Sequence, residues 1–307
     1  MASPTLDKTS PIVIVGAGVF GLSTALHLAE RGYTKVTILD KQSYHESQYS
    51  YSKGCDAASA GTFLHFLLLK RTDNSPDINK IIRSAYGSQV EYQTLALDAM
   101  THWKKWNEEI KQGKTLPPGF TTQDAIFVNN GNVNFTSDAG LPEFEKVTIE
   151  NMTKVGLGKT QIVLTNPEDV KHAKASGFGF AVNPFNRKST YGLLDLQGGF
   201  VYSDKACRFA LHKAQKLGVR TILGGAEGTF SHFLRDANSR ILGVQTSDGV
   251  SHSAELTIMA CGGWTPSLVT QLDNLCETTA GSVCIFHLPP GSPLWDRFAP
   301  ENFPTWT

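Results

Sequence analysis

The sequence lacks the features that mark several large classes of protein. Its 307 residues carry 28 basic and 28 acidic side chains, and with no net charge we expect neither nucleic acid nor an anionic membrane as a partner. The five cysteines are odd in number, and no CxxC or Cys/His cluster has the spacing of a zinc site. This usage favours reduced, intracellular thiols over a disulfide framework.

Long hydrophobic runs and a secretory signal are also missing. The apolar run FLHFLLL covers residues 63–69, whereas a helix that spans a bilayer needs about 20 apolar residues. The first ten residues, MASPTLDKTS, lack the basic and apolar regions of a signal peptide. We therefore expect a soluble, cytoplasmic protein, and we expect it to be a monomer.

What is present points to an α/β enzyme. The apolar share is 40%, and the 28 glycines suit a globular α/β chain rather than a disordered one. A chain of this length can bury one large core or two modest ones, which favours two interleaved domains.

The first forty residues carry the strongest signal. Residues 11–15 (PIVIV) are typical of a strand buried in a parallel sheet, residues 22–32 (LSTALHLAERG) predict an amphipathic helix, and residues 35–39 (KVTIL) predict a second strand. The turn between the first strand and the helix is GAGVFG, residues 16–21, and Asp40 follows the second strand. Together these elements form the dinucleotide-binding fingerprint in its required context.

Each residue of the fingerprint has a physical role. Gly16 makes the tight turn, Gly18 lets the backbone approach a pyrophosphate, and Gly21 allows the helix to pack on the strand. Val19 and Phe20 lie at the helix N-terminus, which faces the phosphate charge. Asp40 can accept hydrogen bonds from a ribose hydroxyl, and Lys41 follows it. A tight turn without a ligand is the plainer alternative.

A later segment bears on the identity of the dinucleotide. Residues 243–249 (GVQTSDG) predict a strand and a turn, and residues 254–260 (AELTIMA) predict another buried strand. The second strand ends in a glycine-rich turn made of Cys261, Gly262, Gly263 and Trp264. Flavoproteins return to FAD with such a turn, although an ordinary turn is the alternative, and the first fingerprint alone does not separate FAD from NAD.

Several segments resemble one family. They are IVIVGAGVFGLSTALHLAERGY (12–33), KGCDAASA (53–60) with DINKIIRSAYGS (77–88), VNPFNRKSTYG (182–192), GGFVYSDKACRFALHKAQKLGV (198–219) and TIMACGGWTPSL (257–268). The chain is similar in these segments to fungal fructosyl amino acid oxidases (amadoriases), saccharopine oxidases and L-pipecolate oxidases, relatives of monomeric sarcosine oxidase. We expect a helix over 77–87 and another over 203–217, with Ser203 or Asp204 as its N-cap.

The resemblance implies an FAD-dependent oxidase. Its substrate would be a secondary amine or N-substituted amino acid that is oxidised to an imine, with O2 reduced to H2O2. By position, Arg83 would bind the substrate carboxylate and Lys80 would lie near the flavin ring, with Ser59 among the cofactor-binding residues. Without the resemblance, Lys80 and Arg83 are three residues apart and read as one solvated edge of a helix.

Two departures from the family pattern stand out. Residues 61–76 (GTFLHFLLLKRTDNSP) interrupt a family element that runs from Ala60 directly to Asp77, and 16 codons could be a retained, in-frame intron; an apolar lid is the alternative. The chain also ends where the family is expected to continue with the cysteine that attaches FAD covalently. None of the five cysteines matches that position, and no C-terminal peroxisomal tripeptide is present.

The predicted fold class is α/β. A Rossmann-like FAD-binding domain, formed by residues 1–114 and 193–280, is expected to interleave with a C-terminally truncated antiparallel-sheet substrate domain, formed by 115–192 and 281–307. The alternatives in function are an inactive FAD-binding remnant and an NAD(P)-dependent dehydrogenase. We predict no metal site.

Overall fold

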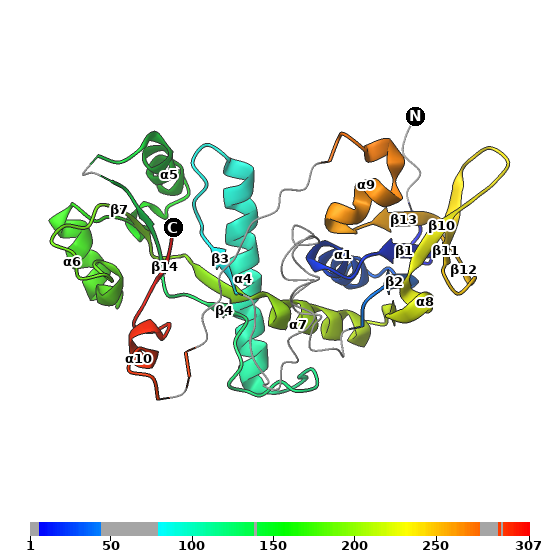
Figure 1. The fold of residues 1–307 in the computed structure, drawn as a ribbon, viewed down its shortest axis with the longest axis horizontal. Helices are drawn as coiled ribbons and strands as arrows, with labels where there is room; N and C mark the ends of the chain where they lie inside the picture. Colours follow the sequence, from blue (N-terminus) through cyan, green and yellow to red (C-terminus); the bar gives the residue numbers. More distant parts are fainter. Residues whose placement is uncertain (1–5, 44–78, 138–139, 277–287, 290) are drawn as a thin grey trace. The chain divides into compact units, whose positions relative to one another are not determined.

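The computed structural model of the chain describes residues 6–43, 79–137, 140–276, 288–289 and 291–307 (Figure 1). The chain divides into two compact units. Unit 1 comprises residues 1–78, 116–119 and 203–283, and unit 2 comprises residues 79–115, 120–202 and 284–307. Ser59 and the insertion at 61–76 lie outside the described residues, so that the predictions made for them stay predictions.

Unit 1 contains a parallel four-stranded sheet. Its strand order is β13-β1-β2-β9, with β1 at Ile12–Val15, β2 at Val36–Asp40, β9 at Arg220–Leu223 and β13 at Leu256–Met259. Every residue of β1 is buried, as expected for a β-branched run in the centre of such a sheet. The register pairs Ile12 with Val36 on one side and with Leu256 on the other.

Helices and a β-meander pack on this sheet. Helix α1 (Val19–Glu30) follows β1 and packs on β1, on β2 and on α7 (Ser203–Lys216). The meander consists of β10 (Phe230–Arg235), β11 (Ile241–Thr246) and β12 (Ser251–Ser253). A hydrophobic cluster joins meander and sheet through Val13, Val15, Leu39, Val244 and Ala254. The short helices α8 (Gly225–Gly228) and α9 (Thr265–Leu268) follow strands β9 and β13 (Figure 1).

Most of the predicted elements of unit 1 are confirmed. Helix α1 ends next to Gly32, which has φ +86°, and helix α7 ends next to Gly218, which has φ +91°. Ser203 is the first residue of α7, in agreement with the predicted start of this helix. The prediction that residues 254–260 form a buried strand is wrong in one respect, because β13 is an edge strand and its residues are half-buried or exposed.

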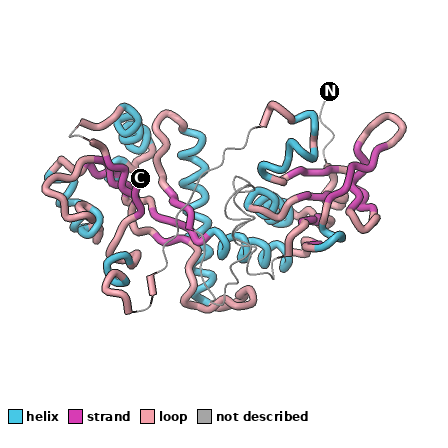
Figure 2. The backbone as a smooth tube through the Cα atoms, in the orientation of Figure 1, coloured by secondary structure: helices cyan, strands magenta, loops and turns pink. Residues whose placement is uncertain are grey.

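The described residues of unit 2 form two sheets and several helices (Figure 2). The first sheet has the order β3-β8-β4 and is antiparallel, with β3 at Asn79–Ile82, β4 at Phe127–Val128 and β8 at Gly199–Tyr202. The second has the order β14-β5-β7-β6, with β5 at Asn132–Phe135, β6 at Gln161–Val163, β7 at Gly192–Asp195 and β14 at Thr305–Trp306. Only β14 pairs in parallel, with β5.

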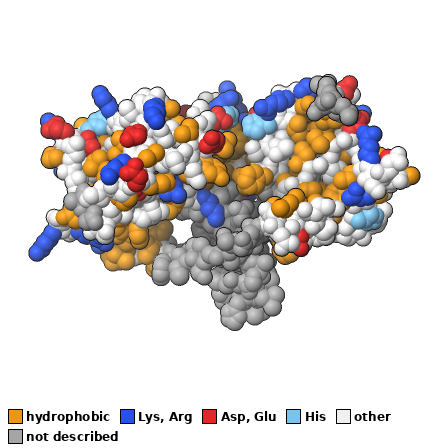
Figure 3. Space-filling model, turned by 90° about the horizontal axis from the view of Figure 1, so that it is seen from above, with side chains coloured by type: hydrophobic (Ala, Val, Ile, Leu, Met, Phe, Trp, Pro, Cys, Tyr) orange, Lys and Arg blue, Asp and Glu red, His pale blue; other side chains and the backbone are white. Residues whose placement is uncertain are grey.

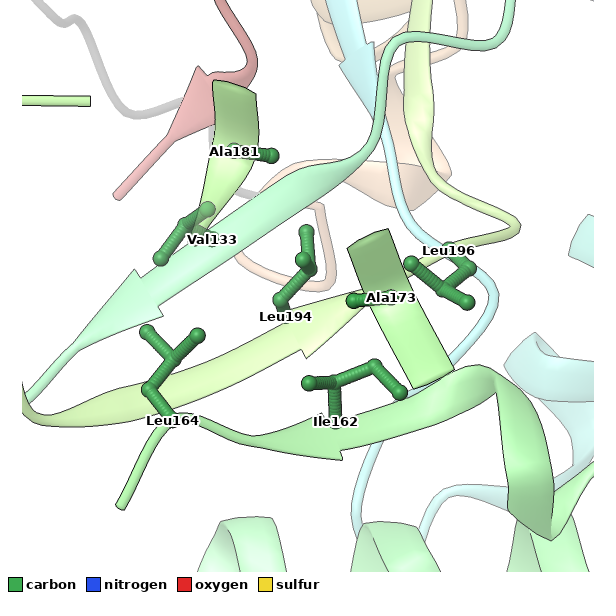
Figure 4. Close-up of a cluster of buried hydrophobic side chains, with 7 residues drawn as sticks. All are labelled: Val133, Ile162, Leu164, Ala173, Ala181, Leu194 and Leu196. Atoms are coloured by element: carbon green, nitrogen blue, oxygen red, sulfur yellow. The ribbon is translucent and has the colours of Figure 1, made fainter. Parts of the chain in front are cut away.

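Two hydrophobic clusters hold the sheets of unit 2 against helices. Helix α4 (Val90–Gln112) packs on the first sheet through Met100, which lies in a cluster with Phe127 and Val201. A larger hydrophobic cluster packs on the second sheet and includes Ala173 near the C-terminal end of α6 (Pro167–Ala175), as Figure 4 shows. Its buried members are Val133, Ile162, Leu164, Ala173, Ala181, Leu194 and Leu196. Helices α5 (Glu143–Lys154) and α10 (Trp295–Phe298) complete the unit.

One predicted helix is replaced by a strand. The pattern in residues 77–87 predicts a helix, whereas residues 79–82 form β3 and pair with β8 in the register Asn79–Tyr202 to Ile82–Gly199. β8 has the sequence GFVY, in which aromatic and β-branched residues favour a strand, and pairing with it outweighs the weak local preference of residues 79–82 for a helix. The alternative interpretation of Lys80 and Arg83 as one solvated edge of a helix is therefore wrong.

The unit boundaries differ from the predicted domain boundaries at four places, and two of these are short: residues 116–119 and 281–283, expected in the substrate domain, fall in unit 1. Residues 79–114 were expected with residues 1–78, and residues 193–202 with 203–280, but both segments fall in unit 2. The pairing of β3 with β8 explains why both segments fall in unit 2, because both strands belong to one sheet.

On the face shown in Figure 3, acidic and basic side chains of the described residues are interspersed rather than separated by sign.

Candidate functional site

The carboxyl ends of the four parallel strands in unit 1 form one edge of the sheet. Because the strands are parallel and in register, the segments that follow them lie side by side at this edge. They are the turn at 16–21 after β1, Asp40 and Lys41 at the end of β2, residues 224–228 after β9, and residues 260–264 after β13. We call this the carboxyl edge of unit 1.

The turn between β1 and α1 requires glycine at two positions. Gly16 has φ +103°, and its nitrogen donates a hydrogen bond of 2.8 Å to the Leu39 carbonyl. A Cβ added to Gly16 would collide with the Ala260 carbonyl, and a Cβ added to Gly21 would collide with the Gly16 carbonyl. These contacts are with backbone atoms, which a rotamer change cannot relieve. The predicted roles of Gly16 in the turn and of Gly21 in helix packing are supported by these approaches.

Gly18 has different surroundings. It is the N-cap of α1, it has an extended backbone, and no side chain caps the helix there. A Cβ added to Gly18 would meet no atom of the described residues within 4 Å. The next two residues are exposed, with Val19 at 51% and Phe20 at 70%. The N-terminus of α1 therefore opens onto space, where the first N–H groups of a helix attract an anion.

Asp40 is anchored by the backbone on both sides. Its Oδ2 accepts a hydrogen bond of 2.7 Å from the Ala17 nitrogen, and its Oδ1 accepts one of 2.9 Å from the Gln42 nitrogen. The side chain thus connects the end of β2 to the glycine turn after β1. A carboxylate oxygen has two lone pairs, and these bonds orient the group for a further donor.

Lys41 and Trp264 meet across the end of β1. Lys41 follows β2 and Trp264 follows β13, and these strands lie on opposite sides of β1 in the sheet. The Lys41 Nζ lies 3.9 Å from the centroid of the Trp264 ring, a cation–π contact. The Cys261 Sγ donates a hydrogen bond of 3.2 Å to the Val15 carbonyl, which fixes the segment after β13 next to the end of β1. Gly262 and Gly263 lie between Cys261 and Trp264 in the chain.

The structure adds a segment that the sequence prediction missed. Residues 224–228 (GGAEG) follow β9, and the Gly224 nitrogen donates a hydrogen bond of 2.8 Å to the Asp40 carbonyl. Gly224 and Gly225 both have positive φ, and a Cβ on Gly228 would collide with the Asp40 carbonyl. A β-branched strand (RTIL) that runs into three glycines is the signal that could have identified this loop.

Lys80 and Arg83 belong to unit 2. Lys80 lies on β3 and is exposed, whereas Arg83 directly follows the strand and is half-buried. The Arg83 guanidinium carbon lies 5.3 Å from the ring centroid of Tyr86 and 6.0 Å from that of Phe144. Two aromatic rings thus hold this guanidinium, which leaves its fork of N–H donors suited to a carboxylate.

A buried carboxylate fixes the backbone next to Arg83. The Oδ2 of Asp195 accepts 2.8 Å hydrogen bonds from both the nitrogen and the hydroxyl of Ser84, and both residues are buried. Its Oδ1 accepts bonds of 2.9 Å from the Gln161 side chain and from the Gln197 nitrogen. This four-bond hub was not anticipated from the sequence, because its members come from three distant segments.

No group of three His, Cys, Asp or Glu side chains in the described part of the chain could hold a metal ion. No helix formed by the described residues is long and apolar enough to cross a membrane.

Comparison with known proteins defines the class. The family of FAD dependent oxidoreductases (DAO) matches residues 11–305, which include both units, and the chain belongs to this family. FAD dependence of the family does not favour the nicotinamide alternative.

Two individual proteins of known name are similar to the chain in sequence. The chain is 26% identical to L-saccharopine oxidase of Schizosaccharomyces pombe over 275 residues, which cover 86% of this chain and 53% of that protein. It is 25% identical to the amino acid oxidase imqH of Aspergillus flavus, over 90% of this chain and 56% of that protein. The chain thus spans about half the length of these relatives.

Solved structures support the fold. The fructosyl peptide oxidase from E. terrenum matches with a TM-score of 0.59 and 24% identity, covering 86% of this chain and 52% of that chain. The fructosamine oxidase Amadoriase II from Aspergillus fumigatus matches with a TM-score of 0.55 and 24% identity, covering 86% and 51%. The expected resemblance to the amadoriase and saccharopine oxidase group and the predicted α/β fold class are confirmed.

Proposed function

We propose that the carboxyl edge of unit 1 binds FAD and that the chain serves the oxidation of a C–N bond in a secondary amine or N-substituted amino acid. The single observation that carries this proposal is the open space at Gly18 between two glycines, Gly16 and Gly21, that tolerate no side chain. A turn that brings backbone N–H groups close to a ligand needs this combination.

The residues present fit the cofactor. In the proposed complex, the N–H groups at the start of α1 bind the pyrophosphate, and Asp40 accepts a hydrogen bond from a ribose hydroxyl. Lys41 supplies a positive charge at the same edge, and Cys261 to Trp264 provide a second wall. Val19 and Phe20, which are exposed, would be covered by the cofactor. Ser59 belongs to the same proposal on the resemblance alone.

Lys80 and Arg83 are proposed as the catalytic residues of unit 2. Bound FAD would accept a hydride from the C–N bond and pass the electrons to O2, which yields an imine and H2O2. Arg83 would bind the substrate carboxylate through a bidentate contact, with its guanidinium oriented by Tyr86 and Phe144. Lys80 would contribute a positive charge that favours an anionic substrate. Saccharopine, pipecolate, sarcosine and fructosyl amino acids are the candidate substrates.

The first experiment is an absorption spectrum of the purified chain with added FAD, from about 300 to 550 nm, before and after acid precipitation. Flavin bands that elute with the protein and move to the supernatant on acid treatment would support non-covalent binding. The variant Gly18→Val should lose these bands while it stays folded, because its side chain would occupy the space proposed for the pyrophosphate. The matched control is Gly179→Ala in unit 2, where an added Cβ has its nearest neighbour at an ordinary 3.6 Å.

Activity is tested separately. The FAD-bound protein is incubated with each candidate substrate while peroxide is measured, and Arg83→Met is compared with the unchanged chain. We expect Arg83→Met to raise KM for carboxylate substrates about 10- to 100-fold, since a charge-assisted bidentate contact is lost. A chain that binds FAD but forms no peroxide with any of these substrates would reduce the proposal to cofactor binding, the inactive remnant among the alternatives.

A further inference from the structure

Arg83 is the first residue of the loop that joins β3 to α4, and no acceptor fixes its guanidinium. We call residues 83–89 the Arg83 loop. The Arg83 side chain makes neither a hydrogen bond nor an ion pair with any residue that the structure describes, and its contacts are with the rings of Tyr86 and Phe144. Its position therefore depends on what holds the backbone of the loop and these two rings.

Helix α5 holds the loop at Gly87 through both backbone groups of this residue. The Gly87 nitrogen donates a hydrogen bond of 3.0 Å to the Thr148 Oγ1, and the Gly87 carbonyl accepts one of 2.8 Å from the Asn151 Nδ2. Thr148 and Asn151 are both buried. The Lys154 Nζ donates at 2.8 Å to the Asn151 Oδ1, which orients the amide nitrogen toward Gly87. Because buried backbone groups need partners, these two side chains supply what the loop requires at this point.

The missing side chain of Gly87 gives room to Phe144. Gly87 has φ +57°, and a Cβ added to it would lie 2.6 Å from the Cδ2 of the Phe144 ring. Phe144, Thr148 and Asn151 are spaced by four and three residues along α5, which places them on one face of this helix. The face that binds Gly87 is thus the face that carries the ring next to Arg83. Holding Gly87 against α5 therefore also sets the distance between Arg83 and Phe144.

The Arg83 loop is attached on both sides of Tyr86. Asp195 binds the backbone and the hydroxyl of Ser84, and α5 binds Gly87. Ser84 and Gly87 are buried, whereas Arg83 is half-buried and so keeps part of its side chain accessible. A side chain that is placed before its ligand arrives loses less conformational freedom on binding, which raises the affinity.

We propose that Thr148 and Asn151 of α5 are positioning residues for Arg83. By holding Gly87 they keep the Phe144 ring beside the guanidinium, so that a carboxylate meets donors that are already oriented. Neither residue touches the substrate, and both act through Gly87. The proposal rests on the carboxylate-binding role of Arg83 in the proposed function, and it assigns the helix that supports this role.

The test measures binding of acetate to the full chain, with acetamide as the neutral compound of the same shape. NMR follows the Nε–H resonance of Arg83 in the isotope-labelled protein, and this resonance is assigned by its loss in Arg83→Met. We expect acetate to bind and to shift the resonance. Acetamide should bind about 10-fold more weakly, because a charge-assisted contact is lost.

Two substitutions release Gly87 from α5. Thr148→Val has nearly the same shape but offers no acceptor to the Gly87 nitrogen, and Asn151→Leu removes the donor to the Gly87 carbonyl. Each should weaken acetate binding about 3- to 10-fold. Thr148→Ser keeps the hydroxyl and should restore the affinity to within about 2-fold of that of the unchanged chain.

The matched control is Asn107→Leu in α4. The Asn107 Oδ1 accepts a hydrogen bond of 2.7 Å from the Ile126 nitrogen, and its Nδ2 donates one of 2.7 Å to the Phe127 carbonyl. Asn107 thus holds a backbone segment as Asn151 does, but this segment lies outside the Arg83 loop. Asn107→Leu should lower the urea midpoint about as much as Asn151→Leu and should leave the acetate affinity within about 2-fold.

Unchanged acetate affinity in Thr148→Val and Asn151→Leu would overturn the proposal, and so would an equal loss in Asn107→Leu. Acetate that does not bind, or that binds Arg83→Met as well as the unchanged chain, would refute both the role of Arg83 and the proposal that rests on it. A chain that binds acetate as expected but shows no flavin bands with added FAD would refute the proposed function and leave the positioning of Arg83 intact. With a substrate that is turned over, the two substitutions should raise KM about 3- to 10-fold and leave kcat within about 2-fold.

Discussion

The two units of the molecule build their key residues in different ways. In unit 1, the glycine turn, Asp40, Lys41 and Trp264 reach one edge because parallel strands end there, and each residue sits within a few positions of its strand. In unit 2, the surroundings of Arg83 depend on Asp195, which lies 111 residues from Ser84 in sequence. Local turn chemistry thus determines the first arrangement, whereas long-range side-chain bonds determine the second.

The largest expected effect breaks the turn of unit 1. Gly21→Ala should lower the free energy of unfolding by at least about 3 kcal/mol, because its Cβ collides with the Gly16 carbonyl and neither backbone can move without disrupting the sheet. Gly18→Ala should change stability by less than about 1 kcal/mol yet weaken FAD binding. Urea denaturation and FAD titration measure both. Equal stability of the two variants would contradict this account of the turn.

A substitution of Asp195 tests the corresponding element of unit 2. Asp195→Asn replaces one accepting oxygen by an amide that faces N–H donors, and we expect a loss of about 2–4 kcal/mol in the free energy of unfolding. The control is Asp169→Asn, where the carboxylate accepts a single bond of 3.0 Å from the Val163 nitrogen, and the expected loss is about 1 kcal/mol. A smaller loss for Asp195→Asn than for this control would show that the hub does not stabilise the unit.

Substitution of Lys41, which contacts Trp264, tests whether this contact affects the stability of unit 1, its FAD affinity or both. Lys41→Met should cost about 0.5–1 kcal/mol and weaken FAD binding several-fold, since a positive charge leaves the carboxyl edge. Unit 1 offers a matched control in Lys8, whose Nζ lies 3.8 Å from the ring centroid of Tyr33 and which is not among the segments of that edge. Lys8→Met should have the same small effect on stability and none on FAD affinity. An equal loss of FAD affinity in both variants would refute a specific role for Lys41.

The smallest effect is a dependence on pH. Burial lowers the pKa of His212 and of His252, and Lys216 and Arg220 respectively lower it further, while Asp248 acts in the opposite direction on His252. Because the folded-state pKa lies below the ordinary value of about 6.5, the unfolded chain binds more protons, and stability decreases as the pH falls through that value. The urea midpoint should therefore be lower at pH about 5.5 than at about 7.5. His252→Gln should flatten the dependence, and an unchanged slope would assign it to other groups.

The success of sequence-based prediction follows the same division between the units. The strand, turn and helix at residues 11–32 and the helix that begins at Ser203 are encoded by local patterns and glycine stops, and the structure confirms them. Residues 79–82 look helical when read alone but form β3, since their partner β8 lies about 120 residues further on. No local pattern contains that information.

The candidate sites show the same limit. Gly16, Gly21 and Asp40 were predicted as cofactor-binding residues from their spacing, and their contacts place all three at the turn after β1, while their role toward a cofactor stays a prediction. The loop at residues 224–228 was missed because it matches no motif, although its glycines contact Asp40 just as closely. The hydrogen bonds around Asp195 were also missed. A buried polar side chain is recognisable only when its donors, from distant segments, are known.

The bond between Cys261 and Val15 joins residues 246 positions apart, and it has a consequence for synthesis in the cell. A ribosome that adds about 5–20 residues per second needs roughly 12–50 s between making Val15 and making Cys261. Throughout that interval the first strand has no neighbour on the β13 side, and the glycine turn lacks the Ala260 carbonyl that packs against it. One edge of the nascent N-terminal strand, which is made of apolar residues, therefore stays unpaired for most of the synthesis of the chain, so that the sheet of unit 1 is completed only late.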